Sequence, residues 1–438
     1  MQKALFYTLI GAAVVAAAVP ADAELAVRTV GASAMLLFLA VMIPRLSVQG
    51  RVLVALIVPL GHLLIVGFAS SAQTWARAMS SGGDFGLLLG AVPLASSFIR
   101  MEHVGEARQH GLGRRLTLPR IGIIQFGLSI ALSIGSLWVA RPLYDTLSAP
   151  AGSRYRTVAA AYSANVAVSP LDAIVNLVLV LAGLTYARFM PFGIALAGLI
   201  AGSTIVVELA LRLKRRVRGG GHVRPAPAPV EGLGGVLART TVLIALVISG
   251  KWFLDLENEV LETGAVLAVV STLLVLLLHG PRELVRTFRR HPDGLAPLTP
   301  VFALIASALF FAGAVGGSPV GDAIVTAGTA LAGLPGALGA LSVIAFTVAL
   351  AAAGVHMVLT VATLGAVLTP AVLGLSEPAF GILLLLSYIA AMNLSPFAPF
   401  TIASAEVNGG AGPLTTIRHD FLVWILVVTA GGVLVGFL

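Results

Sequence analysis

The chain has 438 residues, of which 58% are hydrophobic and only 11% are charged, and it contains no cysteine. A mean hydropathy of +1.00 excludes a soluble globular domain and indicates an all-α polytopic membrane protein. Without cysteine, disulfides and thiolate metal sites are excluded. The formal net charge is +8, but the basic residues lie in short loops between apolar segments. They therefore report membrane topology, and we expect no nucleic-acid partner.

The first apolar run, residues 4–20, resembles a secretory signal peptide, and Ala21-Asp22-Ala23 resembles a cleavage site. We interpret this run as a retained first helix, because the distribution of basic residues requires it. Further apolar runs at 25–43 and 52–70 complete a group of N-terminal helices.

A basic linker rich in Gly and Pro, Arg212–Pro229, divides the chain into two halves. The order of apolar runs on either side of it predicts five segments. They are N-terminal scaffold helices over 1–83, a first repeat over 84–212, a cytoplasmic linker over 213–238, further scaffold helices over 239–296 and a second repeat over 297–438.

Each repeat is predicted to contain a re-entrant hairpin followed by a broken helix. The hairpins, 121–141 and 338–372, are apolar stretches interrupted by small and polar residues. The broken helices, 157–185 and 378–413, carry prolines inside an apolar run, and proline disfavours a straight helix. Backbone freed in this way at membrane depth is tolerated only where it is buried in protein or lines a cavity.

The two breaks have similar sequences. In each, an Asn precedes a Ser-Pro pair: Asn165, Ser169 and Pro170 in the first, and Asn393, Ser395 and Pro396 in the second. Paired interruptions at corresponding places in two halves are the best sequence indication of a transporter binding site. The structural alternative is a pair of proline kinks covered by neighbouring helices.

The distribution of charge predicts the topology. With the N-terminus in the cytoplasm and each hairpin returning to the side from which it enters, nearly all of the 27 Lys and Arg residues are cytoplasmic. The exceptions are Arg28, Arg77, Arg188 and Lys251. This asymmetry predicts a multi-pass protein of the bacterial inner membrane with about 11 transmembrane helices, a cytoplasmic N-terminus and a periplasmic C-terminus. The two halves then have the same order of elements and opposite orientations, which defines an inverted-topology repeat.

This arrangement resembles the ion transporter superfamily, which includes divalent-anion/sodium symporters, subunits of binding-protein-dependent dicarboxylate carriers and arsenite-efflux pumps. The resemblance covers about 84–212 and 297–438 and depends on architecture and motif position. Where the symporters have Ser-Asn-Thr at both hairpin tips, this chain has Ser133-Ile-Gly-Ser136 and Gly354-Val-His-Met-Val-Leu-Thr360. The resemblance implies an elevator mechanism, in which hairpins and broken helices move together against a scaffold, and a homodimer.

Small, hydroxyl and amide residues at the tips and breaks form the predicted substrate site. The N-termini of half-helices suit an anion, and unwound carbonyls suit a hard cation such as Na⁺. The sequence shows no cluster typical of a transition-metal site. The candidate substrate-binding residues are Ser133, Gly135, Ser136, Asn165, Ser169, Pro170, Gly354, His356, Thr360, Asn393, Ser395, Pro396, Thr401 and Ser404.

Three ionisable residues are candidates for ion coupling. His356, at the second tip, could bind a carboxylate or carry a proton, or it could be hydrogen-bonded within the hairpin. We favour a functional role, because ionisable groups within membranes are usually functional. Asp172 and Glu406 each follow a break, where either could hold a cation or a proton, or cap a half-helix. Glu208 and Arg212 have the spacing of an ordinary helical ion pair.

Motifs of nucleophilic, phosphate-binding and metal-dependent enzymes are absent from the sequence, so we do not expect an enzyme. We predict a secondary active transporter of a small organic anion of the carboxylate class, coupled to Na⁺ or H⁺, with no cofactor other than such a Na⁺ ion. One alternative is the large membrane subunit of a binding-protein-dependent (tripartite) carboxylate carrier. Another is a cation/proton antiporter, which would ordinarily need well-placed intramembrane carboxylates.

Overall fold

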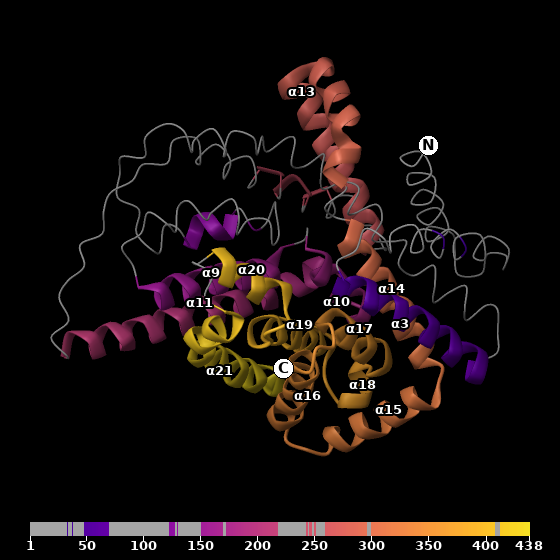
Figure 1. Ribbon diagram of the computed structural model, residues 1–438, viewed down its shortest axis with the longest axis vertical. Helices are drawn as coiled ribbons and strands as arrows, with labels where there is room; N and C mark the ends of the chain where they lie inside the picture. Colours follow the sequence, from indigo (N-terminus) through magenta and orange to yellow (C-terminus); the bar gives the residue numbers. More distant parts are fainter. Residues whose placement is uncertain are drawn as a thin grey trace.

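The computed structural model describes residues 48–69, 122–127, 150–169, 172–217, 259–295, 299–407 and 412–438, with a few isolated positions between 33 and 250. All regular structure in these residues is helical (Figure 1). The predicted tip of the first hairpin, most of the N-terminal scaffold and the linker beyond Val217 lie outside them.

Four helical segments in these ranges are long and apolar enough to cross a membrane: Tyr186–Lys214, Ala265–Thr287, Glu377–Ala405 and Pro413–Phe437. A fifth candidate consists of Ala303–Gly316 and Pro319–Ala332, which are bent by 81° at a short break. These spans place the protein in a membrane, as its composition predicts.

The first predicted broken helix consists of α9 (Ala151–Val168) and α10 (Ala173–Ala182). The second consists of α19 (Glu377–Leu394) and α20 (Pro399–Val407). Both breaks begin where the sequence places a Ser before a Pro. Ser169 (φ −77°, ψ 119°) and Ser395 (φ −93°, ψ 129°) are extended. A residue before proline is forced into this conformation, because the proline ring disfavours the helical one.

The predicted hairpin over 338–372 contains α16 (Gly336–Ala352), α17 (Met357–Val367) and the short α18 (Pro370–Leu373). The turn between α16 and α17 contains Gly354, which has a φ of +94°. Such a backbone strongly favours glycine, because a Cβ clashes with the backbone at positive φ. At about 1.5 Å per residue, α17 is too short to cross a hydrocarbon core of about 30 Å.

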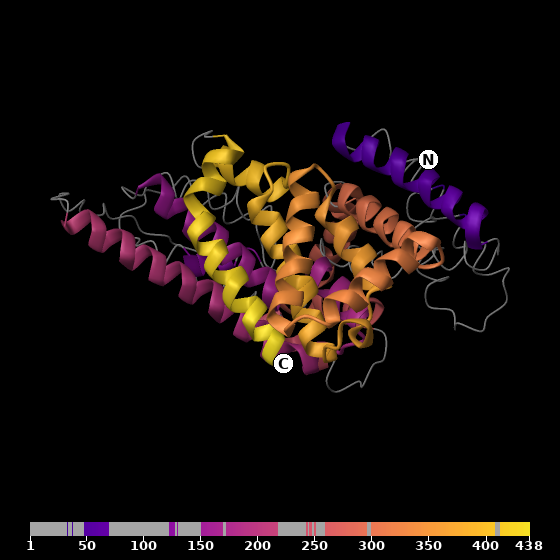
Figure 2. The ribbon, with the colours of Figure 1, turned by 90° about the horizontal axis from the view of Figure 1, so that it is seen from below.

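The second half of the chain forms the packed centre of the molecule. α19 is apolar on all sides and almost fully buried, as expected for a helix at the core of a bundle. α21 (Pro413–Phe437) packs along α16 and α19 (Figure 2). A Cβ on Gly436 would collide with the backbone of Ala337, so this glycine permits the close approach of α21 to α16.

The remaining helices surround this centre. α14 (Thr299–Gly316) packs between α17 and α3 (Val48–Leu64), and α15 (Pro319–Ala332) packs on α18. α11 (Tyr186–Val217) runs along α9 and contacts α21. α13 (Glu259–Leu295), bent at Gly280, extends away from the other helices (Figure 1).

Candidate functional site

The two helix breaks lie side by side. The Asn393 amide on α19 donates to the Ser163 hydroxyl on α9 over 3.0 Å, and to its own helix at the Ile389 carbonyl over 2.8 Å. The Tyr162 ring stacks on the Phe400 ring of α20, with centroids 4.6 Å apart. These contacts bring together segments that are far apart in the sequence.

The second break is also joined to the hairpin tip. The Ser395 hydroxyl donates to the Ala351 carbonyl at the end of α16 over 2.7 Å, and it accepts from the Phe397 amide over 3.2 Å. Between them is a very small, partly open cleft, lined by Gly354–Met357 of the tip and by residues 397–399 of the break. The N-terminus of α20 therefore borders a space between two interrupted elements.

Side chains cover some of the backbone that the prolines release. The Thr401 hydroxyl donates to the Met392 carbonyl over 2.8 Å. The Tyr186 hydroxyl donates to the Val168 carbonyl, at the end of α9, over 2.6 Å. Here the structural alternative applies, because these two bonds satisfy carbonyls near the breaks.

Two of the ion-coupling candidates cap half-helices. An Asp172 carboxylate oxygen accepts from the Ile174 amide over 2.9 Å, at the start of α10. The His356 Nδ1 atom accepts from the Val358 amide over 3.3 Å, at the start of α17. The third candidate, Glu406, lies on α20, but its side chain is outside the described part of the structure. Ion coupling by these three residues stays a prediction.

Other buried polar groups near the breaks have no hydrogen-bond partner among the described residues. Asn165 is only 1% exposed, and neither its amide nitrogen nor its amide oxygen bonds to any residue that the structure describes. The same is true of the Asn393 amide oxygen and of the buried Thr360 hydroxyl on α17. A buried polar atom without a partner costs about 1–3 kcal/mol. These atoms are therefore suited to bind a polar solute.

Asn165 lies three positions after Tyr162 on α9, and Tyr162 stacks on Phe400 of α20. Ser404 on α20 is fully buried and Ser169 ends α9, whereas Ser133, Gly135, Ser136 and Pro170 lie outside the described ranges. Within those ranges, His, Asp and Glu form no group of three that could hold a metal ion.

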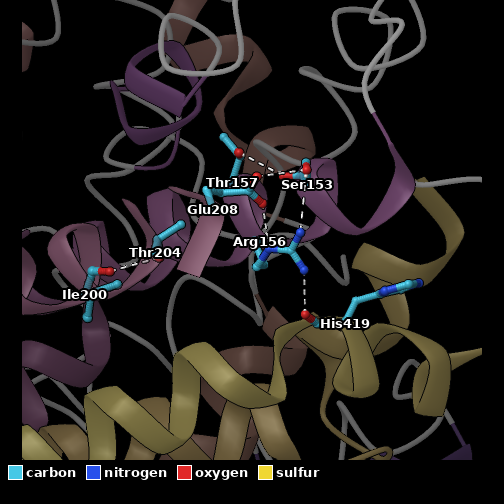
Figure 3. Close-up of polar contacts among 7 residues, drawn as sticks. All are labelled: Ser153, Arg156, Thr157, Ile200, Thr204, Glu208 and His419. Atoms are coloured by element: carbon cyan, nitrogen blue, oxygen red, sulfur yellow. Dashed lines mark hydrogen bonds and ion pairs between the residues drawn. The ribbon is translucent and has the colours of Figure 1, made fainter. Parts of the chain in front are cut away.

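A second buried polar cluster joins α9, α11 and α21 (Figure 3). The Arg156 guanidinium donates to the Glu208 carboxylate over 2.6 Å and to the His419 carbonyl over 2.8 Å. The sequence pairs Glu208 with Arg212 by spacing alone, whereas the structure gives it Arg156, 52 positions away. No local pattern signals this contact; the only sequence sign is a charged residue inside an otherwise apolar run.

Comparison with known proteins identifies the fold. No protein-family model matches the chain, and no curated protein matches it. Among solved structures, the chain is similar to the crystal structure of the Alcanivorax borkumensis YdaH transporter, which is described as having an unusual topology. The TM-score is 0.54 at 14% identity, over 93% of this chain and 97% of that one.

The likeness extends over nearly the full length of both chains, and at this identity it shows the fold alone. The chain thus has the fold of a membrane transporter, and its apolar helices agree with that class.

Proposed function

We propose that this protein is a secondary active transporter of a small organic anion of the carboxylate class, coupled to Na⁺ or H⁺. The observation that carries the proposal is the buried Asn165 amide on α9, whose polar atoms bond to no described residue. A buried amide that bonds to no described residue is costly, and an anion would accept from its NH₂ group. The transporter fold is consistent with this role.

The cleft between the hairpin tip and the second break favours an anion over a neutral solute. Pro399, the first residue of α20, lines this cleft, and a helix N-terminus carries partial positive charge. The N-termini of α10 and α17 are capped by Asp172 and His356. Among these three half-helices, α20 is therefore the one whose N-terminus is available to a ligand.

The proposed mechanism is an elevator mechanism. Each chain contains two inverted repeats, and two chains form a homodimer. The Ser395–Ala351 bond ties the second break to the hairpin, and the Asn393–Ser163 bond ties it to the first broken helix. Elements connected in this way would move as one body. The same elements would serve the large subunit of a tripartite carrier, which a neighbouring gene for a periplasmic binding protein would favour.

A thermal-shift screen tests the proposal. Purified protein is heated with a panel of mono- and dicarboxylates, each with and without Na⁺, because a ligand that binds only the folded state stabilises it. We expect at least one carboxylate to raise the unfolding temperature of the parent protein, and Asn165→Ala to lose most of that shift. Ser387→Ala is the matched control, since Ser387 is buried on α19 and makes no hydrogen bond with a described residue. The anion site would be refuted if no carboxylate in the panel raised the unfolding temperature of the parent protein. It would also be refuted if the same carboxylate raised the unfolding temperature of Asn165→Ala by as much as that of the parent protein.

A further inference from the structure

The buried cluster around Arg156 contains more negative than positive charge. Besides Arg156, it contains two carboxylates, Glu208 on α11 and Asp420 on α21. Asp420 is only 2% exposed, and the side chains of the Arg156–Glu208 pair are 6% and 13% exposed. If both carboxylates near this one guanidinium were ionised, one negative charge would be left in a site from which water is largely excluded.

The hydrogen bonds of Arg156 are directed to groups other than Asp420. Its Nε donates to Glu208, its Nη1 to the His419 carbonyl, and its Nη2 to the Ser153 hydroxyl over 3.5 Å. Ser153 in turn donates to the second oxygen of Glu208 over 3.0 Å. Both carboxylate oxygens of Glu208 therefore accept a hydrogen bond, and each guanidinium nitrogen already has an acceptor.

Asp420 lacks such compensation. One of its carboxylate oxygens accepts no hydrogen bond from the described residues. The charges that act on it oppose each other, since Arg156 attracts an ionised Asp420 and Glu208 repels it. A buried carboxylate with an oxygen that accepts no hydrogen bond is costly as an anion and less so as a neutral acid.

The other titratable groups around Asp420 do not supply a compensating charge at its carboxylate. The Tyr155 ring stacks on the His419 ring, with centroids 5.5 Å apart. The charge of Arg154 interacts with the Tyr155 hydroxyl, and the charge of the exposed Arg418 interacts with the His419 ring. Of the other helices packed on α21, α16 carries no titratable residue, α19 carries Glu377 and Tyr388, and α20 carries Glu406.

We propose that Asp420 is a proton-binding site, which holds a proton while Arg156 is paired with Glu208. Release of the proton leaves a second carboxylate that competes with Glu208 for the Arg156 guanidinium. The proton therefore favours the observed arrangement of α9 against α11 and α21, and its loss favours another. The use of this proton to couple transport rests on the proposed function, whereas the protonation itself does not.

Infrared spectroscopy of the full-length protein in lipid tests the protonation without any substrate. A protonated carboxylic acid has a C=O band distinct from that of a carboxylate, and ¹³C-labelled aspartate shifts the bands of Asp alone. Comparison of the unlabelled with the labelled protein identifies the bands of Asp. We expect a protonated Asp band between about pH 5 and about pH 8. That band should be weaker in Asp420→Asn than in the wild type, retained in Asp172→Asn, and lost in the double variant Asp172→Asn/Asp420→Asn. If labelled wild-type protein shows no protonated Asp band in this range, the proposal is overturned even where Asp420→Asn does not fold. A protonated Asp band of equal intensity in Asp172→Asn and in the double variant Asp172→Asn/Asp420→Asn also overturns it.

The pH dependence of unfolding gives a second readout. An ordinary Asp in the unfolded chain is ionised above about pH 5, so the native state would hold one more proton than the unfolded state. Stability then falls as pH rises, by up to about tenfold in the unfolding equilibrium per pH unit. Asp420→Asn should remove this slope relative to Ser387→Ala, and an equal slope in both variants would contradict the proposal.

The two proposals can fail separately. A protonated Asp420 band in a protein that no carboxylate stabilises would support the proton site and refute the anion site. Stabilisation by a carboxylate in a protein without the band would do the reverse.

Discussion

Ser395 provides the sharpest test of how the second break is held. Its hydroxyl makes two bonds, donating to the Ala351 carbonyl and accepting from the Phe397 amide, and it is 1% exposed. Ser395→Ala removes both bonds and leaves a buried carbonyl and an N–H at the turn. With a net value of about 0.5–1.5 kcal/mol for each bond, the expected loss of unfolding free energy is about 1–3 kcal/mol.

Ser387 on the same helix is the matched control. It lies about two turns earlier, is fully buried, and its hydroxyl has no partner among the described residues. Ser387→Ala should therefore be neutral or slightly stabilising, because it removes a buried polar atom that makes no bond. Unfolding by a denaturing detergent in mixed micelles measures both variants. Equal stability of Ser395→Ala and Ser387→Ala would show that the bond to the hairpin tip contributes nothing.

Four further outcomes are expected. Asn393→Ala should weaken binding of a stabilising carboxylate by about 5- to 150-fold, measured by thermal-shift titration, and unchanged affinity would contradict a shared site. Gly354→Ala should cost about 1–2 kcal/mol from its positive φ, and Gly354→Asn less, because Asn tolerates this region better. Glu208→Ala should lower the free energy of unfolding by about 3–5 kcal/mol, because Arg156 is left buried without its partner. If Glu208→Ala lowers it by less than Glu208→Gln does, the ion pair is not important for stability. A reporter that is active only in the cytoplasm should be inactive after Leu438, and activity there would refute the predicted topology.

The breaks and the second hairpin turn could be predicted from the sequence because their causes are local. Pro170 and Pro396 restrict the residue before them, and both preceding serines are extended. Gly354 permits a turn that other residues disfavour. Such signals depend on one or two residues, so they do not require knowledge of the tertiary packing. The helix bounds were less predictable: α9 begins at Ala151, although the sequence suggests residue 157.

The partners across the breaks could not be predicted, because they depend on how each helix is rotated. Symmetry predicts that Asn165 and Asn393 approach each other. In the structure, Asn393 bonds to Ser163, two positions before Asn165 on α9. Successive residues of a helix are rotated by about 100°, so Ser163 and Asn165 lie on nearly opposite sides of α9, and the sequence pattern does not show which side meets α19. The Arg156–Glu208 pair shows the same limit, because 52 positions separate its members.

Sequence chemistry also left two roles open for Asp172 and His356. Each could cap a half-helix or bind an ion, because both tasks use the same oxygen or nitrogen atom. The structure shows the cap in both cases. In Asp172 one carboxylate oxygen accepts from a backbone amide and the second oxygen can still bind an ion. In His356 the capping atom is Nδ1, so only the other ring nitrogen is left. Capping therefore restricts His356 more than Asp172 as an ion-coupling group.

α9 connects the two polar regions of the protein. Arg156 is in its first half and Asn165 is near its end, about 14 Å farther along the helix at about 1.5 Å per residue. A continuous helix transmits a displacement along its axis with little loss, and α9 is unbroken between these residues. A change of partner at Arg156 would therefore shift Asn165 relative to Phe400 and Asn393. The same helix would couple protonation of Asp420 to the geometry of the proposed anion site, so a proton could control binding without contacting the substrate.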